Sequence, residues 1–466
     1  MKKILTLIIG LAVTTITYSQ KEISSVSASG SGVTTAYLSD YQCLGINPAN
    51  IGFTRDSAVF HVSLLEIGAS VYSDALQKKE IKQDFIFNHE TSFTPEEKIA
   101  AAEEFASNKF SVNLDVAWLS LSFQKEKFGG LGFTVRERTN FNTFFNKDFA
   151  EIVFEGYNAS YFDSLVVNGT DTAGYAKVPK TFGELADGSK IAGVWYREYV
   201  VGYGKKIISS NTFSLYAGIG IKYLAGYGII DIKAENKQLT GYSATTPFMG
   251  INYANSTPSE IAGNAMKTVG SGFGFDFGAT IEIKKKLKIS AALNDIGSIK
   301  WDGNVYQAKD TLINNVNFDG FSNFNMIKET KALIQDSSLF NWKGQQSQTI
   351  GLPANMRFGV NYLFGFRSSI GADCYIPVND NAGSFDKAII GGGASICFFK
   401  MLTLSAGFYT GGNSGFVIPM GVTISSKDNS WQMGIASRDI VTFVKKDNPT
   451  VSIALGFIKF CFGKYK

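Results

Sequence analysis

The sequence lacks any hydrophobic run long enough to cross a membrane as a helix. Such a helix needs about 20 consecutive apolar residues, and the longest apolar stretch, residues 4–13, is much shorter. Yet hydrophobic residues make up 45% of the chain, aromatic residues 14% and charged residues only 18%. In hydrocarbon every backbone polar group must find a partner inside the protein, so a chain without apolar helices can span a bilayer only as a closed β-barrel. The composition therefore favours a barrel.

Residues that commonly catalyse reactions or bind metals are also scarce. The chain has two histidines and four cysteines, and they show neither the spacing of a metal site nor that of a catalytic triad. His61 and Ser63 share one face of an expected strand, which loosely resembles barrel phospholipases, but no matching elements surround them. We therefore expect no enzyme, no catalytic residue, no metal and no cofactor. No spacing selects a disulfide pair among the cysteines, which are Cys43, Cys374, Cys397 and Cys461.

The amino terminus has the layout of a secretory signal peptide. Lys2 and Lys3 precede the apolar residues 4–13, and small side chains at Thr17 and Ser19 suit a signal peptidase. We expect cleavage after residue 19, so that residues 1–19 direct the chain to export and to the outer membrane.

The charge balance gives no hint of a nucleic-acid partner. Lys and Arg number 44 against 40 Asp and Glu, a net charge of +4. Without Lys2 and Lys3 the balance becomes 42 against 40, or +2.

Two segments alternate with period two, which is typical of β-strands with two unlike faces. In residues 213–229 every odd position is apolar, whereas Lys222 and several glycines occupy even positions. In residues 273–283 apolar side chains alternate with glycine, threonine, Asp276 and Glu282. A charge on the lipid face at the bilayer midplane costs roughly 2 to 4 kcal/mol. We therefore expect Lys222, Asp276 and Glu282 to face the barrel lumen.

Comparable segments recur and bring the number of expected strands to about fourteen, an even number as single-chain bacterial barrels require. The fold class is all-β: a transmembrane antiparallel up-and-down β-barrel over residues 58–466, preceded by an N-terminal hatch, or plug, over residues 20–57. The expected strands are residues 58–72, 110–123, 130–140, 193–207, 213–229, 273–283, 287–296, 356–366, 368–376, 388–399, 402–410, 416–425, 431–440 and 451–462.

The connections between the expected strands alternate between long and short. Up-and-down barrels show this asymmetry because periplasmic turns are tight hairpins, whereas extracellular loops are free to grow. We expect the long connections outside the cell as solvated lids over the barrel mouth, with one surface helix after the capping-box residues Thr94 and Glu97. The long connections are residues 73–109, 141–192, 230–271 and 297–355.

Aromatic residues are expected at the membrane interfaces. Near the carboxyl end, where barrels usually finish on an aromatic residue, either Phe462 or Tyr465 fills that position. Six tyrosines near the ends of expected strands are candidates for the aromatic girdles: Tyr72, Tyr203, Tyr227, Tyr362, Tyr375 and Tyr409.

Two short motifs carry a resemblance to a known family. The first, ahead of the first strand, resembles the N-P-A element in the hatch of FadL-type long-chain fatty-acid transporters, and comprises Asn47, Pro48, Ala49, Asn50 and Gly52. The second is similar to a D-[IL]-G-x-I-x-W phrase in an uncharacterised family of Bacteroidota outer-membrane proteins related to those barrels, and comprises Asp295, Ile296, Gly297 and Trp301. From the residues alone, the first motif also fits a surface turn.

The resemblance implies a fourteen-stranded barrel plugged by its own amino-terminal segment, with hydrophobic or amphipathic small molecules as cargo. A transporter or channel for such molecules is the first functional hypothesis. The alternative is a non-transporting barrel that acts as a scaffold or partner in an outer-membrane secretion or assembly complex, because fold does not settle function. The expected partners are the lipid bilayer, a hydrophobic small molecule and, for the alternative, secretion or assembly proteins. An outer-membrane hydrolase is the least favoured reading.

Overall fold

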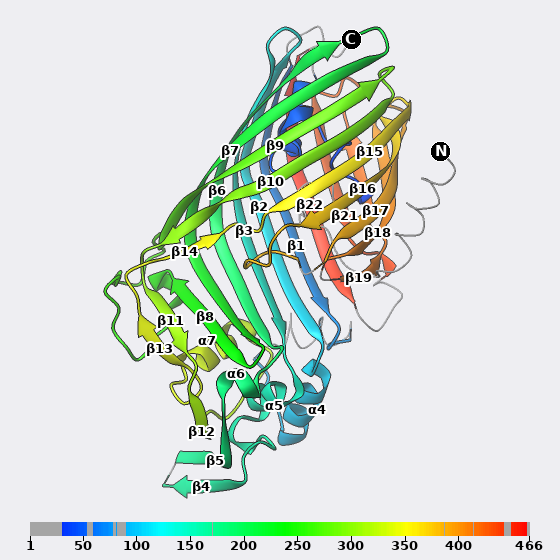
Figure 1. The fold of residues 1–466 in the computed structure, drawn as a ribbon. Coiled ribbons are helices and arrows are strands. Elements are labelled where there is room, and N and C mark those ends of the chain that lie inside the picture. Colours follow the sequence, from blue (N-terminus) through cyan, green and yellow to red (C-terminus); the bar gives the residue numbers. More distant parts are fainter. Residues whose placement is uncertain are drawn as a thin grey trace, which may run out of the picture.

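The chain closes one large antiparallel sheet into a barrel (Figure 1). The computed structural model describes residues 30–53, 59–77, 81, 90–169, 171–385, 387–412, 414–441 and 449–463. The predicted signal peptide, residues 1–19, lies outside the described residues, and so do residues 20–29 and 54–57 of the predicted hatch.

Fourteen strands form the barrel wall, and each pairs antiparallel with its neighbours. The first and last strands close the ring, with Phe60 opposite Phe462. This confirms the predicted all-β, up-and-down architecture. The wall strands are β1 (Val59–Ser73), β2 (Lys109–Lys125), β3 (Gly129–Phe144), β6 (Lys190–Ser209), β7 (Phe213–Glu235), β9 (Gly270–Ile283), β10 (Leu287–Trp301), β15 (Asn355–Gly365), β16 (Ser368–Pro377), β17 (Ile389–Phe398), β18 (Leu402–Gly411), β20 (Met420–Ser425), β21 (Trp431–Ser437) and β22 (Thr450–Phe462).

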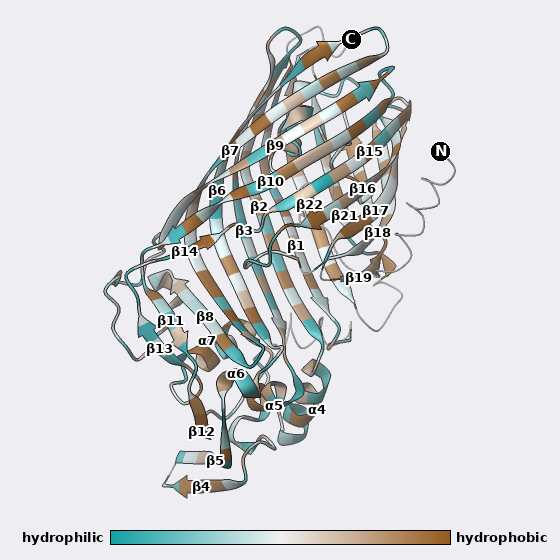
Figure 2. Cartoon of the chain, in the orientation of Figure 1, coloured by the Kyte–Doolittle hydropathy of each residue, from teal (hydrophilic) through white to brown (hydrophobic). Residues whose placement is uncertain are grey.

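Side chains alternate between the two faces of the wall, as the period-two pattern predicts. On β7, Ile219 and Ile221 point outward and are 40% and 47% exposed, whereas Lys222 between the outward positions is fully buried inside. Figure 2 shows this alternation of apolar and polar residues along the strands. Apolar carbon therefore covers most of the outside, with the ion pair of Arg197 and Glu137 as an exception, and most of the polar groups are gathered in the lumen.

The wall strands differ in length around the barrel. β6 has 20 residues and β7 has 23, but β20 has only 6 and β21 only 7. The expected strand 416–425 is interrupted at Pro419, which separates β19 (Ser414–Val417) from β20 because proline has no N–H to donate. The expected strand 431–440 ends at residue 437 for β21.

The long connections fold together into one body at one end of the barrel, which we call the cap (Figure 1). Its sheet elements extend β7 and β10 or form a separate three-stranded sheet. They are β8 (Gln238–Thr245), β11 (Val305–Lys309), β13 (Asn341–Gly344) and β14 (Gln348–Gly351), and β4 (Ser164–Asn168), β5 (Asp171–Thr181) and β12 (Leu312–Val316). Its helices are α4 (Pro95–Phe105), α5 (Lys147–Glu155), α6 (Phe182–Leu185) and α7 (Met326–Gln335), with short 3-10 turns η4 (Gly156–Asn158) and η5 (Pro247–Met249).

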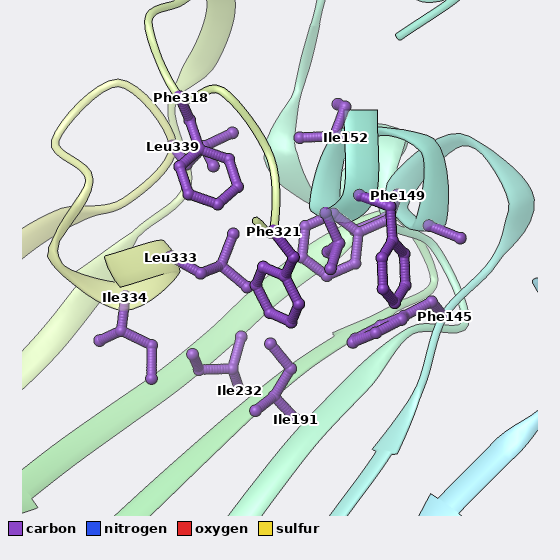
Figure 3. Close-up of a cluster of buried hydrophobic side chains, with 14 of the residues drawn as sticks. Phe145, Phe149, Ile152, Ile191, Ile232, Phe318, Phe321, Leu333, Ile334 and Leu339 are labelled. Carbon is purple, nitrogen blue, oxygen red and sulfur yellow. The ribbon is translucent and has the colours of Figure 1, made fainter. Parts of the chain in front are cut away.

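A phenylalanine-rich core holds the cap together, which the expectation of solvated lids did not foresee. Figure 3 shows Phe145 and Phe149 packed beside Phe321, with Ile191 and Ile232 of the wall strands below them. The predicted surface helix is present as α4, and its capping box is formed, with the Glu97 N–H donating to Thr94 Oγ1. Its last residue, Phe105, is buried in this core.

Four of the six tyrosines predicted for the girdles are buried, so the girdle prediction is wrong for them. Tyr72 and Tyr227 are only 3% and 7% exposed. Tyr375 and Tyr409 are 4% and 1% exposed and are buried in a small apolar cluster with Phe385. Tyr362, by contrast, is 43% exposed on the outer surface. The four cysteines, all among the described residues, form no disulfide with one another. Among the described helices, none is long and apolar enough to cross a membrane.

Candidate functional site

Residues 30–53, which we call the inner segment, lie inside the barrel and are almost entirely buried. They contain the 3-10 helices η1 (Asp40–Cys43) and η2 (Pro48–Gly52), drawn in dark blue within the ring of strands (Figure 1). Asn47 caps η2, because its Oδ1 accepts from the Ala49 N–H at 3.2 Å. The Asn47 Nδ2 also donates to Thr280 Oγ1 of β9 at 2.9 Å, which fastens the cap to the wall.

Glycines on the lumen face of the wall make room for the inner segment. A Cβ added at Gly130 would lie 1.8 Å from the Ile51 carbonyl oxygen, and one at Gly218 would lie 2.4 Å from the Pro48 carbonyl. On the opposite wall, a Cβ at Gly393 would lie 1.8 Å from the Ser31 carbonyl oxygen. The inner segment is therefore seated backbone against backbone on two walls, where any side chain would collide with it.

Polar side chains from several strands bind the remaining backbone of the inner segment. Asp373 of β16 accepts from the Thr34 and Thr35 N–H groups at 2.6 and 2.9 Å. Gln124 of β2 donates to the Ile51 carbonyl at 2.8 Å, and Asn294 of β10 donates to the Ile46 carbonyl at 2.9 Å. These bonds satisfy backbone groups that have no sheet partner.

The second sequence motif builds a bulge that aims a carboxylate into the lumen. Asp295 has φ +59 where the pairing of β10 with β9 shifts register, and its side chain contacts the Lys222 ammonium. Lys222 also pairs with Asp276 at 2.9 Å, and both are fully buried. The other motif residues shape the wall: a Cβ at Gly297 would lie 2.0 Å from the Phe273 carbonyl oxygen, and Trp301 packs where Cβ atoms at Gly226 and Gly270 would stand.

Two arginines extend this charge cluster. Arg136 lies 3.7 Å from Asp115 and 3.6 Å from Glu198, and the Arg138 Nε lies 3.3 Å from Glu198. The Arg138 Nη1 and Nη2 atoms are buried and have no hydrogen-bond partner among the described residues. A cavity of about 40 Å³ opens beside Arg138, bounded also by Tyr196 and Phe385. The cluster thus presents unused donors to a small internal space.

An apolar cluster lies beside these charges. Tyr196 belongs to it and also bounds the Arg138 cavity. The buried indole N–H of Trp301 has no hydrogen-bond partner among the described residues. The buried members of the apolar cluster are Val194, Tyr196, Leu224, Ile229, Ala244, Val269, Ile299, Trp301, Val305, Leu352 and Ala382.

The wall has an irregular place between β21 and β22. Gly434 and Gly456 stand opposite each other, and the register shifts between Gln432 and Gly434. A cavity of about 20 Å³ there is bounded by the lumen residue Glu66 and by Met433, an outward residue that is 39% exposed. We call this place the β21–β22 notch, because side chains of both faces meet there.

A wide polar vestibule of about 780 Å³ occupies the short-turn end of the barrel. Glu282 bounds it, accepts from the Tyr216 hydroxyl at 3.3 Å and is half-buried, so it lies near the mouth and apart from Lys222 and Asp276. Lys288 lies over the Phe53 ring, 3.5 Å from its centroid.

His61 contacts a serine, but not the one singled out from the sequence. Its Nδ1 lies 3.1 Å from Ser122 Oγ, and the two residues are 3% and 1% exposed. His61 also bounds the vestibule. In the part of the chain that the structure describes, no group of three or more His, Cys, Asp or Glu residues is arranged to hold a metal ion.

Comparison with known proteins gives a family and a set of solved barrels. A model described as "Family of unknown function (DUF5723)" matches residues 48–423. No curated protein matches. A mutant TodX monoaromatic hydrocarbon channel is similar at 11% identity and a TM-score of 0.45, over 94% of this chain and 98% of that one. The toluene transporter TodX of P. putida follows at 11% and 0.44, over 96% and 99%. A Pseudomonas aeruginosa FadL homologue is similar at 10% and 0.41, over 96% and 97%.

Proposed function

The chain belongs to the DUF5723 family of unknown function, and we propose that it is an outer-membrane channel for amphipathic small molecules, plugged by the inner segment. The observation that carries this proposal is the meeting of two unlike surfaces inside the lumen. The cavity beside the unpaired Arg138 donors is also bounded by Tyr196, which belongs to the apolar cluster. A single ligand in that cavity can therefore contact both surfaces.

The outer surface supports placement in a membrane. On β9 the outward residues Phe273, Phe275 and Phe277 are 57%, 39% and 45% exposed. A soluble protein rarely leaves so many large apolar side chains in contact with water, whereas lipid tails solvate them. The lumen, by contrast, collects the charges that a bilayer would reject.

The cargo site combines a cation with an apolar wall. A buried donor without a partner costs about 1 to 3 kcal/mol, so an acceptor oxygen of a ligand beside Arg138 would regain that energy. The cavity of about 40 Å³ has room only for that group, so the body of the same ligand would have to displace the side chains of Val194 and Phe385, which bound the cavity, and lie against them. An apolar molecule with one anionic or strongly accepting group fits this arrangement best.

The proposed exit is the β21–β22 notch, because the inner segment is held too tightly to move aside. Withdrawing it would break the bonds to Asp373, Gln124 and Asn294 together. At the notch, by contrast, Gly434 and Gly456 carry no side chains that block the way. Small local movements of the two strands would connect the lumen to the lipid phase.

Binding of dodecanoate to the purified full-length protein tests the cargo site. Arg138→Gln should weaken binding at least about tenfold, equivalent to ~1.4 kcal/mol, because it removes the cation beside the cavity. Arg197→Gln is the matched control, since Arg197 pairs with Glu137 on the outer surface. Dodecanoate that fails to bind saturably, or that binds both variants equally, would contradict the proposal.

One observation favours the scaffold alternative. The edge strand β4 leaves all of its residues exposed, including Leu165 at 52% and Val167 at 66%. An unpaired apolar edge is a template for a strand of a partner protein. Photo-crosslinking from position 167 in intact cells would yield one defined adduct if the scaffold function holds, and none if the cap simply faces solvent.

A further inference from the structure

The short connections of the barrel are strongly basic. Their cations outnumber their two carboxylates, Glu126 and Asp428, and we call the cations the turn ring. They come from five of the six short connections and so are spread around the barrel rather than gathered on one side. The turn ring consists of Lys127, Lys284, Lys285, Lys286, Arg367, Lys400 and Lys427.

Exposed aromatic rings lie in the same connections. Phe399 is 90% exposed and has φ +51, and Phe366 is 50% exposed. A bulky residue with positive φ at a turn tip is unusual, and such a ring gains nothing from facing water. The Arg367 guanidinium lies 4.8 Å and the Lys400 Nζ 5.5 Å from the centre of the Phe366 ring. Cations and rings are therefore held at one level, as they are where a protein meets lipid headgroups.

The opposite end of the molecule has the opposite charge. In the cap, helix α4 carries Glu96, Glu97, Glu103 and Glu104 against the single cation Lys98. Charge is thus polarised along the barrel axis, although the net charge of the chain is only +4.

We infer that the turn ring binds the anionic headgroups of phospholipids in the membrane leaflet at the short-turn end. This inference rests on the proposed membrane-spanning function. A ring of cations around the whole barrel matches an annulus of lipid, whereas a docking protein would be matched by a patch on one side. Each Lys or Arg near an anionic bilayer surface favours binding by about fivefold, and several act together here.

Lipid retention tests the inference on the full-length protein. The barrel is reconstituted in equimolar phosphatidylethanolamine and phosphatidylglycerol and released gently, and the bound lipids are counted by native mass spectrometry. We expect phosphatidylglycerol to exceed phosphatidylethanolamine by at least about threefold, a preference that weakens at high salt. Reversing three turn charges, Lys284→Glu, Lys285→Glu and Lys286→Glu, should abolish most of this preference, and the corresponding Gln variants should reduce it.

The matched control reverses three exposed lysines of the cap, Lys147→Glu, Lys177→Glu and Lys180→Glu, with the same change in net charge. The preference should survive in this control. Equal loss in both triple variants, or equal retention of the two lipids by the wild type, would overturn the inference. A protein that does not insert into the bilayer, judged by the absence of heat-modifiable gel mobility, would instead contradict the proposed function.

Discussion

Ile51 and Gly130 meet so closely that a Cβ at Gly130 would lie 1.8 Å from the Ile51 carbonyl oxygen. The inner segment and the wall are therefore complementary at the level of backbone atoms. This contact leaves the inner segment no room to slide along the wall strand. Several glycines of the wall strands are therefore positions where a side chain would collide with the inner segment.

One added methyl group on β7 tests how closely η2 packs against this strand. Gly218→Ala places a Cβ 2.4 Å from the Pro48 carbonyl, so we expect the inner segment to shift, at a cost of about 1 to 3 kcal/mol in stability. Single-channel conductance in planar bilayers should rise. Gly228→Ala on the same strand is the control, because the nearest atom to its Cβ would lie 4.0 Å away. Equal conductance of the two variants would argue against the seat.

Replacing Asn47-Pro48-Ala49 with Gly-Gly-Gly should loosen the plug and also raise conductance. The change removes the cap of η2 and the Asn47 bonds to Thr35 and Thr280. Loss of a helix cap alone costs about 0.5 to 2 kcal/mol. Conductance that stays at the wild-type value, with heat-modifiable mobility intact, would show that these residues do not hold the lumen closed.

Lys222 balances two buried carboxylates. Lys222→Met should lower the free energy of unfolding by about 3 to 5 kcal/mol, because Asp276 and Asp295 then remain buried without a cation. Urea unfolding from lipid vesicles measures this change. Adding Asp276→Asn and Asp295→Asn should recover part of the loss. The exposed Lys205→Met should change stability by no more than ~0.5 kcal/mol, and a similar value for Lys222→Met would contradict the prediction.

The loop that follows β16 should loosen in acid. The hydrogen bond from the Lys233 ammonium, at 2.8 Å, lowers the pKa of Asp380. A lowered pKa in the folded state means that the contact is fully present above the ordinary aspartate value of about 3.9 and is lost as the pH falls through the lowered value. An exposed pair of this kind contributes only about 0.2 to 1 kcal/mol.

Hydrogen exchange of the loop amides measures this effect. The protection factors of these amides, which correct the exchange rates for the intrinsic pH dependence of amide exchange, should fall below about pH 4, and Asp380→Asn should show the lower protection already at pH 7. Asp428→Asn serves as the control, because Asp428 lies in a turn at the other end of the barrel. An unchanged loop in Asp380→Asn would mean that other contacts alone anchor it, such as the bond from Asn379 to the Leu352 carbonyl at 2.8 Å.

The hatch motif could be found in the sequence, but its partners could not. Asn-Pro-Ala-Asn is a local signal for a capped turn, and the structure places it as η2. The residues that receive it, Gly130, Gly218 and Thr280, lie far away in sequence and have no local signal that sets them apart. A glycine in a barrel strand is equally consistent with a bend in the strand and with the close approach of another backbone.

The sequence pattern predicted only part of the charge cluster. Alternation along β7 and β9 points Lys222 and Asp276 inward, but the same rule assigns Asp295 no partner. Its position depends on a bulge with φ +59, which re-aims one side chain against the strand pattern. Arg136, Arg138 and Glu198 were missed because isolated charges in a strand do not reveal which neighbours they meet.

The sequence by itself determined the class of fold, because alternation with period two and the absence of long apolar helices are local properties that leave a closed barrel as the remaining solution. Only the tertiary structure decided what fills the barrel and what covers it. The seat of the inner segment, the Arg138 cavity and the phenylalanine core of the cap each include pairs of residues more than a hundred positions apart, such as Pro48 with Gly218 and Arg138 with Phe385. Such contacts follow from strand register and loop packing, which a linear pattern does not encode.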